Sequence, residues 1–120
     1  IRILRLAEVI LNRSEAYAGL NITDSALIDL NMIVERADPG ATVSGISGET
    51  LKDRILLERR KELAFEGHRL FDLNRTRKDI NIIHSDGVII ATYPNDRFIL
   101  PIPLSELDSN NKINTNNPGY

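Results

Sequence analysis

Apolar residues recur three and four positions apart over the first part of the chain, which is the spacing of one face of an α-helix. Gly19 suits the end of a first helix, and Thr23 or Asp24 suits the start of a second. The second helix is expected to stop at Asp38, because Pro39 disfavours helical backbone in the residue before it. The pattern therefore predicts a pair of helices over residues 2–38. The expected inner face of the second helix consists of Leu27, Leu30, Asn31, Val34 and Ala37.

Residues 39–47 are rich in Gly, Ser and Thr, a composition typical of a surface loop, and Ser47 is placed to cap a third helix. From residue 48 to residue 77 apolar residues again recur at helical spacing, and no proline interrupts them. We therefore expect one long helix over 48–77, in which Gly67 is the weak point.

Residues 78–120 carry little helical signal and much turn chemistry. Asp86-Gly87 lies between two short apolar segments, 82–83 and 88–90, and this pattern predicts a small β-hairpin. Three later prolines remove backbone donors, so we expect residues 97–104 to form an extended strap against the helices. The remainder is expected to be an irregular tail.

Together these elements predict an all-α fold with a helical hairpin, a long third helix and an irregular C-terminal segment. The hairpin has the length of one tetratricopeptide-type unit, whose helices pack small residues together. One copy is present, whereas such repeats need about three or more units to bury a continuous core. The chain also starts at Ile1 without an initiator methionine. We therefore expect a fragment of a longer protein.

Composition excludes several kinds of chemistry. The 120 residues contain no cysteine, so disulfides, thiolate metal sites and cysteine nucleophiles are absent. The formal net charge of −2 argues against a nucleic-acid surface over the whole domain. His68 and His84 have no second histidine at the spacing of metal ligands, so neither a metal nor another cofactor is expected. The sequence has no apolar run long enough to span a membrane.

Charged residues lie between the apolar anchors of the expected long helix, at spacings of three and four that let opposite charges meet. Half-buried charges need partners, so we expect a structural ion-pair network. Its members are Glu58, Glu62, Glu66, Arg69, Asp72 and Arg75. Glu62 and Glu66, one turn apart, suggest an alternative role as the acid and base of a hydrolase, which would need a cleft.

Five segments resemble, in the same order, the C-terminal region of the SusD/RagB family of outer-membrane nutrient-binding lipoproteins of Bacteroidetes. They are Leu4–Tyr17, Asp29–Ala37, Glu58–Leu73, Ile99–Pro103 with Glu106, and Asn117–Tyr120. The resemblance spans nearly the whole chain but only the last part of a family member. It implies a C-terminal fragment, residues 1–120, of a mostly helical domain with tetratricopeptide-like helix pairs.

The resemblance also implies a binding protein and not an enzyme. Family members lie at the outer surface of the outer membrane, held by a lipidated N-terminal cysteine that would lie outside this chain. There they pass oligosaccharides, or sometimes peptides, to a TonB-dependent SusC-like barrel. Glycan binding needs aromatic faces, and this chain has few, so we expect it to be mainly scaffold. Tyr93 is the candidate for ligand contact, with a packing or turn role as its alternative. The rival to this function is a tetratricopeptide-like protein-interaction module without a sugar ligand.

Overall fold

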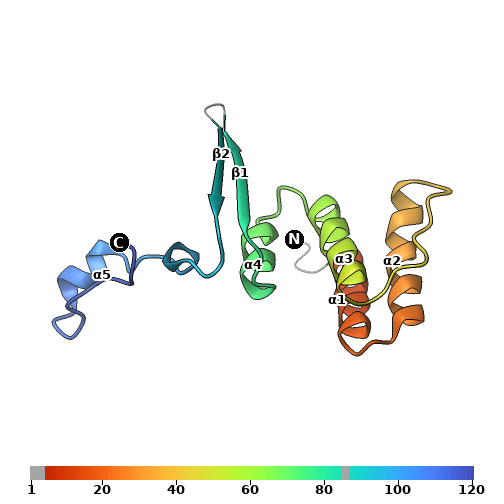
Figure 1. Ribbon diagram of the computed structural model, residues 1–120. Helices are drawn as coiled ribbons and strands as arrows, with labels where there is room; N and C mark the ends of the chain where they lie inside the picture. The colour runs from red at the N-terminus through yellow and green to blue at the C-terminus, as the bar shows by residue number, and fades with distance from the viewer. Residues whose placement is uncertain (1–4, 85–86) are drawn as a thin grey trace. The chain divides into compact units, whose positions relative to one another are not determined.

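The computed structural model describes residues 5–84 and 87–120. These residues fall into two compact units, Ile1–Arg69 and Leu70–Tyr120, and each is described by itself. The order of elements along the chain can be followed in Figure 1. In the part of the chain that the structure describes, no helix is both long and apolar enough to cross a membrane.

The first unit begins with the helical hairpin, formed by α1 (Leu6–Gly19) and α2 (Thr23–Ala37). Both helices lie within the range expected from the sequence, and α2 ends before Asp38 as predicted. The Ser14 hydroxyl donates to the Ala26 carbonyl oxygen over 2.8 Å, and both residues are fully buried. These small side chains let the two helices approach closely, so the hairpin is confirmed. Its tetratricopeptide-like character stays a prediction.

The inner face of α2 agrees in part with the expected one. Leu30 and Val34 are buried as expected, and Leu27 packs partly buried against the core. The structure also buries Ala26, Asp29 and Ile33, whereas Ala37 is exposed. Asn31 instead lies at the margin, where its side-chain amide exchanges two hydrogen bonds with the backbone of Val43.

A third helix, α3 (Gly48–Glu62), packs on α1 and α2 through the fully buried Leu51 and Ile55. The single helix expected over 48–77 is wrong, because a turn at residues 63–67 separates α3 from α4 (His68–Arg75). Gly67 adopts a left-handed φ of 79° and Phe65 one of 66°, which helical backbone does not allow. The carbonyl of Glu62 accepts a hydrogen bond from Arg5 at this point.

The second unit contains a two-stranded antiparallel sheet of β1 (Ile80–His84) and β2 (Gly87–Ala91), with Ile80 opposite Ala91. The strands confirm the predicted β-hairpin, while Asp86 of its turn lies outside the described residues. A 3-10 turn, η1 (Asp96–Phe98), follows.

The segment expected to be wholly irregular contains one short helix, α5 (Leu104–Ser109). Pro103 precedes it with a φ of −54°, which suits the start of a helix. The extended strap expected over 97–104 is wrong at both ends, because it begins inside η1 and its last residue starts α5. Residues 99–103 between them are held by Asn116, whose side chain accepts from the Ile102 amide over 2.7 Å and donates to its carbonyl over 3.3 Å.

Candidate functional site

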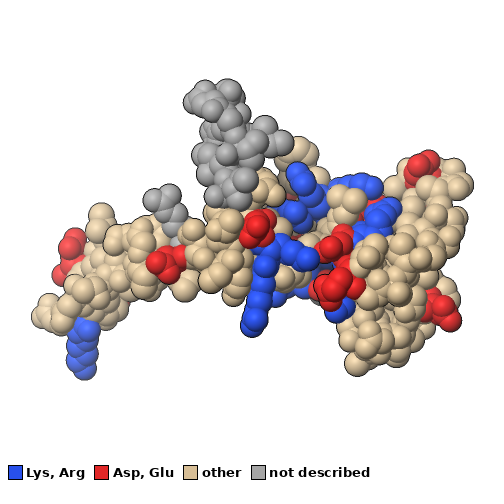
Figure 2. All heavy atoms as spheres, in the orientation of Figure 1, with Lys and Arg blue, Asp and Glu red and all other residues tan. Residues whose placement is uncertain are grey.

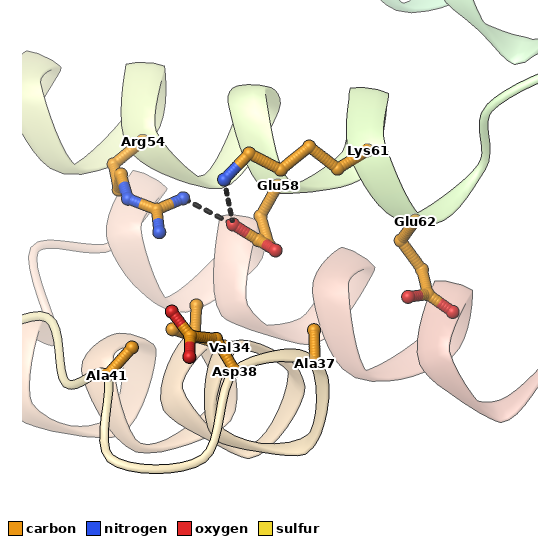
Figure 3. A pocket seen from close by; sticks show the side chains of 8 residues that line it. All are labelled: Val34, Ala37, Asp38, Ala41, Arg54, Glu58, Lys61 and Glu62. Atoms are coloured by element: carbon orange, nitrogen blue, oxygen red, sulfur yellow. Dashed lines mark hydrogen bonds and ion pairs between the residues drawn. The ribbon is translucent and has the colours of Figure 1, made fainter.

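A pocket of about 220 Å³ lies between the end of α2 and α3 in the first unit (Figure 3). One wall consists of small apolar side chains together with the carboxylate of Asp38, and the α3 wall carries charge of both signs. Arg54 and Lys61 converge on one oxygen of Glu58, at 2.5 and 3.3 Å. The spacing of these residues along α3, four and three positions, brings them together. The pocket is lined by Val34, Ala37, Asp38, Ala41, Arg54, Glu58, Lys61 and Glu62.

The lining of this pocket lacks the aromatic side chains on which sugar rings stack. None of its eight lining residues is aromatic, so a sugar ring would find no flat apolar face. The Glu58 side chain is 5% exposed and two cations already meet it. The Glu58 carboxylate is therefore already engaged by two cations of its own helix.

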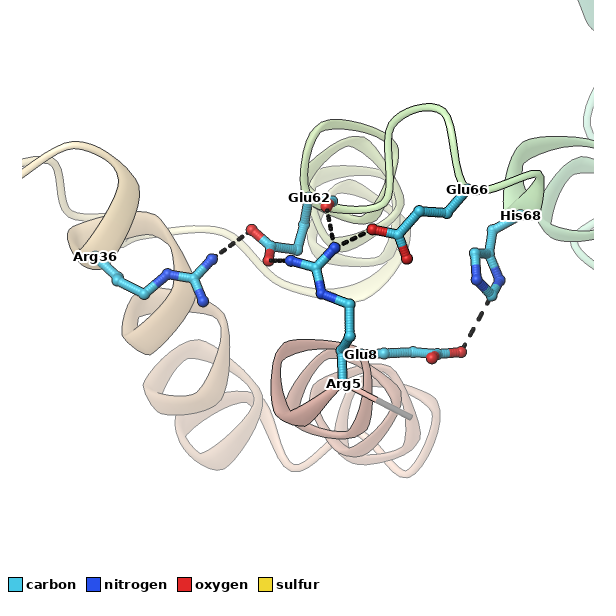
Figure 4. Close-up of polar contacts among 6 residues, drawn as sticks. All are labelled: Arg5, Glu8, Arg36, Glu62, Glu66 and His68. Atoms are coloured by element: carbon cyan, nitrogen blue, oxygen red, sulfur yellow. Dashed lines mark hydrogen bonds and ion pairs between the residues drawn. The ribbon is translucent and has the colours of Figure 1, made fainter. Parts of the chain in front are cut away.

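A second polar cluster joins the three helices of the first unit at the end of α3 (Figure 4). Glu62 is its centre. One oxygen of Glu62 accepts from Arg5 over 2.6 Å and the other accepts from Arg36 over 2.5 Å. Arg5 also bonds the carboxylate of Glu66 and, over 3.2 Å, the Glu62 carbonyl. A guanidinium at the C-terminal end of a helix is favoured by the helix dipole.

This geometry does not suit acid–base catalysis by Glu62 and Glu66. Both carboxylates are engaged in ion pairs with the same guanidinium, that of Arg5. Nearby, His68 Nδ1 lies 3.9 Å from Glu8 on α1. The cluster ties Arg5, α2, α3 and the following turn into one unit.

A third ion pair, which sequence reasoning missed, links α1 to α2. Arg13 donates from Nε and Nη2 to the two carboxylate oxygens of Asp29, over 2.7 and 2.8 Å. The Asp29 side chain is 4% exposed and that of Arg13 is 57% exposed. Asp29 raises the pKa of Arg13, first through the side-chain hydrogen bonds and then through charge attraction. The signal was present, since Asp29 is a carboxylate one turn from Ile33 on an apolar face.

The second unit holds Asp72, Arg75 and Tyr93, three of the residues singled out from the sequence as candidates. The side chain of Asp72 is 6% exposed, and its Oδ1 accepts from Arg75 over 2.7 and 2.9 Å. Tyr93 packs its ring edge-on against Phe98, with centroids 5.6 Å apart, and is 36% exposed. The Tyr93 amide donates to Asp79 over 2.8 Å. A ligand role for Tyr93 stays a prediction.

Members of the expected ion-pair network make ion pairs in both units. Glu58 pairs with Arg54 and Lys61, Glu62 and Glu66 pair with Arg5, and Asp72 pairs with Arg75. Arg69 is half-buried beside the start of α4. A connection of all six stays a prediction. Figure 2 shows that the face in view of the first unit carries both acidic and basic side chains.

Within residues 5–84 and 87–120, no group of three His, Asp or Glu side chains is arranged to hold a metal ion. In the first unit, the pairs Arg13–Asp29 and Arg36–Glu62 join different helices, whereas the pairs of Glu58 and of Glu49 lie within α3.

Comparison with known proteins agrees with this architecture. The model of the SusD family matches residues 1–120. The SusD-like protein P2 of Formosa agariphila is 31% identical over 98% of this chain. A SusD superfamily protein from Bacteroides vulgatus is 34% identical over 98% of the chain, with a TM-score of 0.79. A SusD-like carbohydrate binding protein from the same organism is 27% identical over 92% of the chain, with a TM-score of 0.68.

The chain spans about a quarter of the length of these relatives: 25% of the first, 27% of the second and 29% of the third. The family model matches the whole chain, and relatives that share its sequence and fold belong to the same family. The chain belongs to the SusD family.

Proposed function

We propose that this chain is part of a cell-surface carbohydrate-binding protein that passes oligosaccharides to a TonB-dependent, SusC-like outer-membrane transporter. A lipid anchor outside these residues would hold the protein to the membrane. The observation that carries the proposal is the family match over residues 1–120. A structural relative with a TM-score of 0.68, described as a SusD-like carbohydrate binding protein, supports the ligand class.

The role proposed for these 120 residues is mainly that of scaffold. The pocket between α2 and α3 lacks an aromatic face, and its buried Glu58 already pairs with two cations. Glu62 is likewise held by Arg5 and Arg36. Side chains engaged in this way fix the positions of helices, and contacts to sugar are expected mainly elsewhere in the complete protein.

The experiment is isothermal titration of the complete gene product with a panel of oligosaccharides. Binding at millimolar or lower Kd supports the proposal. Co-purification with a β-barrel partner, without binding of any oligosaccharide or peptide, would favour the interaction-module alternative. Turnover of a chromogenic glycoside that Glu62→Gln abolishes would contradict the proposal of a binding protein.

Tyr93 provides a test of the scaffold role within the same titrations. Tyr93→Phe keeps the ring packed on Phe98, and Tyr93→Ala removes it. Stacking of an aromatic residue on a sugar would make the alanine variant bind more weakly while the phenylalanine variant retains most affinity. Unchanged affinity in both variants is the result expected for a scaffold region.

A further inference from the structure

One carboxylate oxygen in the pocket between α2 and α3 has no partner among the described residues. Arg54 and Lys61 both contact Oε2 of Glu58, and no described residue bonds its Oε1 (Figure 3). The Glu58 side chain is only 5% exposed. Among the described residues that are not themselves exposed, no fully buried side-chain oxygen lacks a hydrogen-bond partner. Oε1 of Glu58 is therefore reached from the pocket, where a ligand can donate to it.

The opposite wall of the pocket adds a second acceptor. The carboxylate of Asp38, directly after α2, lines the pocket and makes no ion pair with a described residue (Figure 3). Asp38 is exposed, so solutes can reach it. Ionised carboxylates accept hydrogen bonds and donate none. The two acceptors therefore favour a positively charged group with several N–H donors, such as a primary ammonium.

Arg54 and Lys61 keep hydrogen-bond donors that Glu58 does not occupy. Each gives Glu58 one bond, whereas a guanidinium has five N–H donors and an ammonium three. Their side chains are 23% and 57% exposed, so both can be approached. The planar fork of a guanidinium matches the geometry of a carboxylate. The pocket thus offers donors for an anionic group beside acceptors for a cationic one.

The balance of charge in the pocket selects between classes of ligand. Five lining residues are charged, and one of them, Glu62, is already held by two arginines from outside the lining. The other four are two cations and two carboxylates, whose formal charges cancel. A ligand with one sign of charge would meet like charges on one wall or the other. A neutral ligand that carries both charges matches all four side chains.

The two charges of the ligand have to lie close together. The free oxygen of Glu58 belongs to the same carboxylate whose other oxygen holds Arg54 and Lys61. An α-amino acid meets this requirement, because its ammonium and its carboxylate are attached to one carbon atom. A volume of about 220 Å³ lies below the range of about 300 to 1,000 Å³ for drug-sized ligands, which suits a molecule of this size.

We propose that this pocket binds a free α-amino acid with a small aliphatic side chain. The ammonium lies between the carboxylates of Asp38 and Glu58, and the carboxylate of the ligand lies on the two cations of α3. The aliphatic side chain packs on the small apolar residues of the lining, Val34, Ala37 and Ala41. The proposal does not depend on the carbohydrate function, because it concerns a pocket without a face for sugar rings.

Titration of the complete gene product with L-valine, followed by saturation-transfer difference NMR, tests the proposal. Isobutylamine keeps the side chain and ammonium of valine without its carboxylate, and isovalerate keeps the side chain and carboxylate without the ammonium. We expect saturable binding of L-valine in the millimolar range or tighter. Both smaller ligands should bind at least about tenfold more weakly, because each leaves one pair of charges in the pocket unmatched.

Asp38→Asn removes one charge from the pocket, and Asp24→Asn makes the same change at an exposed carboxylate of α2 outside the lining. We expect the first to weaken L-valine binding at least about tenfold and the second to leave it within about twofold of the parent value. Lys61→Gln, with the same expected loss, replaces Asp38→Asn where the latter fails to fold.

Three results would overturn the proposal. They are the absence of saturable L-valine binding, a smaller ligand that binds as tightly as L-valine, and parental affinity in the folded pocket variant. Titration of the same variants with oligosaccharides reports the carbohydrate function separately, so the failure of one proposal is distinguished from the failure of the other.

Discussion

The ion pair between Arg13 and Asp29 makes an asymmetric prediction about stability. Asp29→Asn keeps the size of the buried side chain and removes its charge, and it places an NH₂ group among the donors of Arg13. Hydrogen bonds to charged groups contribute about 1.5 to 3 kcal/mol. Arg13 is 57% exposed and can return to water, which reduces the loss. We therefore expect Asp29→Asn to lower the free energy of unfolding by about 1 to 2 kcal/mol.

Arg13→Met is expected to destabilise more than Asp29→Asn, although Arg13 is the more exposed partner. The methionine variant leaves the carboxylate of Asp29, which is 4% exposed, buried without its cation. A buried charge without a partner lowers the free energy of unfolding more than an unpaired charge that water can solvate.

The pH dependence follows from the raised pKa of Arg13. A cation with a raised pKa contributes stability that is complete below its unfolded pKa and is lost only as the pH rises through its folded pKa. Because arginine ordinarily titrates above about 12, the difference between the parent protein and Asp29→Asn should stay constant from neutral pH to about pH 10.

Hydrogen exchange, measured by mass spectrometry on the complete protein, tests the predicted losses of stability in peptides from α1 and α2. A loss of about 1.4 kcal/mol in the free energy of opening lowers the protection of an amide about tenfold. Glu35→Gln is the matched control, because Glu35 is an exposed carboxylate on the same helix, and its effect should stay within about 0.5 kcal/mol. If Arg13→Met lowers the free energy of unfolding less than Asp29→Asn does, the argument that the buried Asp29 charge depends on its cation is refuted.

Three further changes test other parts of the first unit. Leu30→Ala, at a fully buried position, should destabilise by about 2 to 5 kcal/mol in chemical denaturation. Gly67→Ala should cost about 1 kcal/mol or more by the same measurement, because its φ of 79° strains a residue with a Cβ, and no loss would contradict the left-handed turn. Asn31→Ala removes both hydrogen bonds to Val43, so limited proteolysis should cut residues 39–47 faster; an unchanged rate would show that other contacts fix the loop.

Local sequence signals predict the hairpin of α1 and α2 well, because helical spacing, Gly19 and Pro39 all act within a few residues. They also predict the strands around Gly87. The expected long helix is wrong because periodicity continued through residues 63–67, while the backbone at Phe65 and Gly67 turned left-handed. A single glycine costs only about 1 kcal/mol in a helix, so the sequence alone gives no decisive sign of a break.

The same distinction explains which ion pairs could be predicted. Asp72 and Arg75, three apart, and Glu58 with Arg54, four apart, meet because one helix turn places them together. Glu62 instead finds partners 57 and 26 positions away. Such pairing depends on how helices cross, which is decided by buried contacts such as that of Ser14 with Ala26.

The break at residues 63–67 and the cluster around Glu62 are two consequences of one arrangement. Arg5 reaches the end of α3 because α1 packs along it, and there it bonds both a carboxylate and the Glu62 carbonyl. That carbonyl belongs to the last turn of α3, whose carbonyls need partners from outside the helix. In a continuous helix the Glu62 carbonyl would accept a hydrogen bond from the Glu66 amide, and Glu66 would lie one helical turn beyond Glu62. The hydrogen bond from Arg5 to the Glu62 carbonyl and the continuation of α3 are therefore mutually exclusive. A left-handed backbone costs little free energy at a glycine, so Gly67 allows the chain to turn here and keep the bond to Arg5.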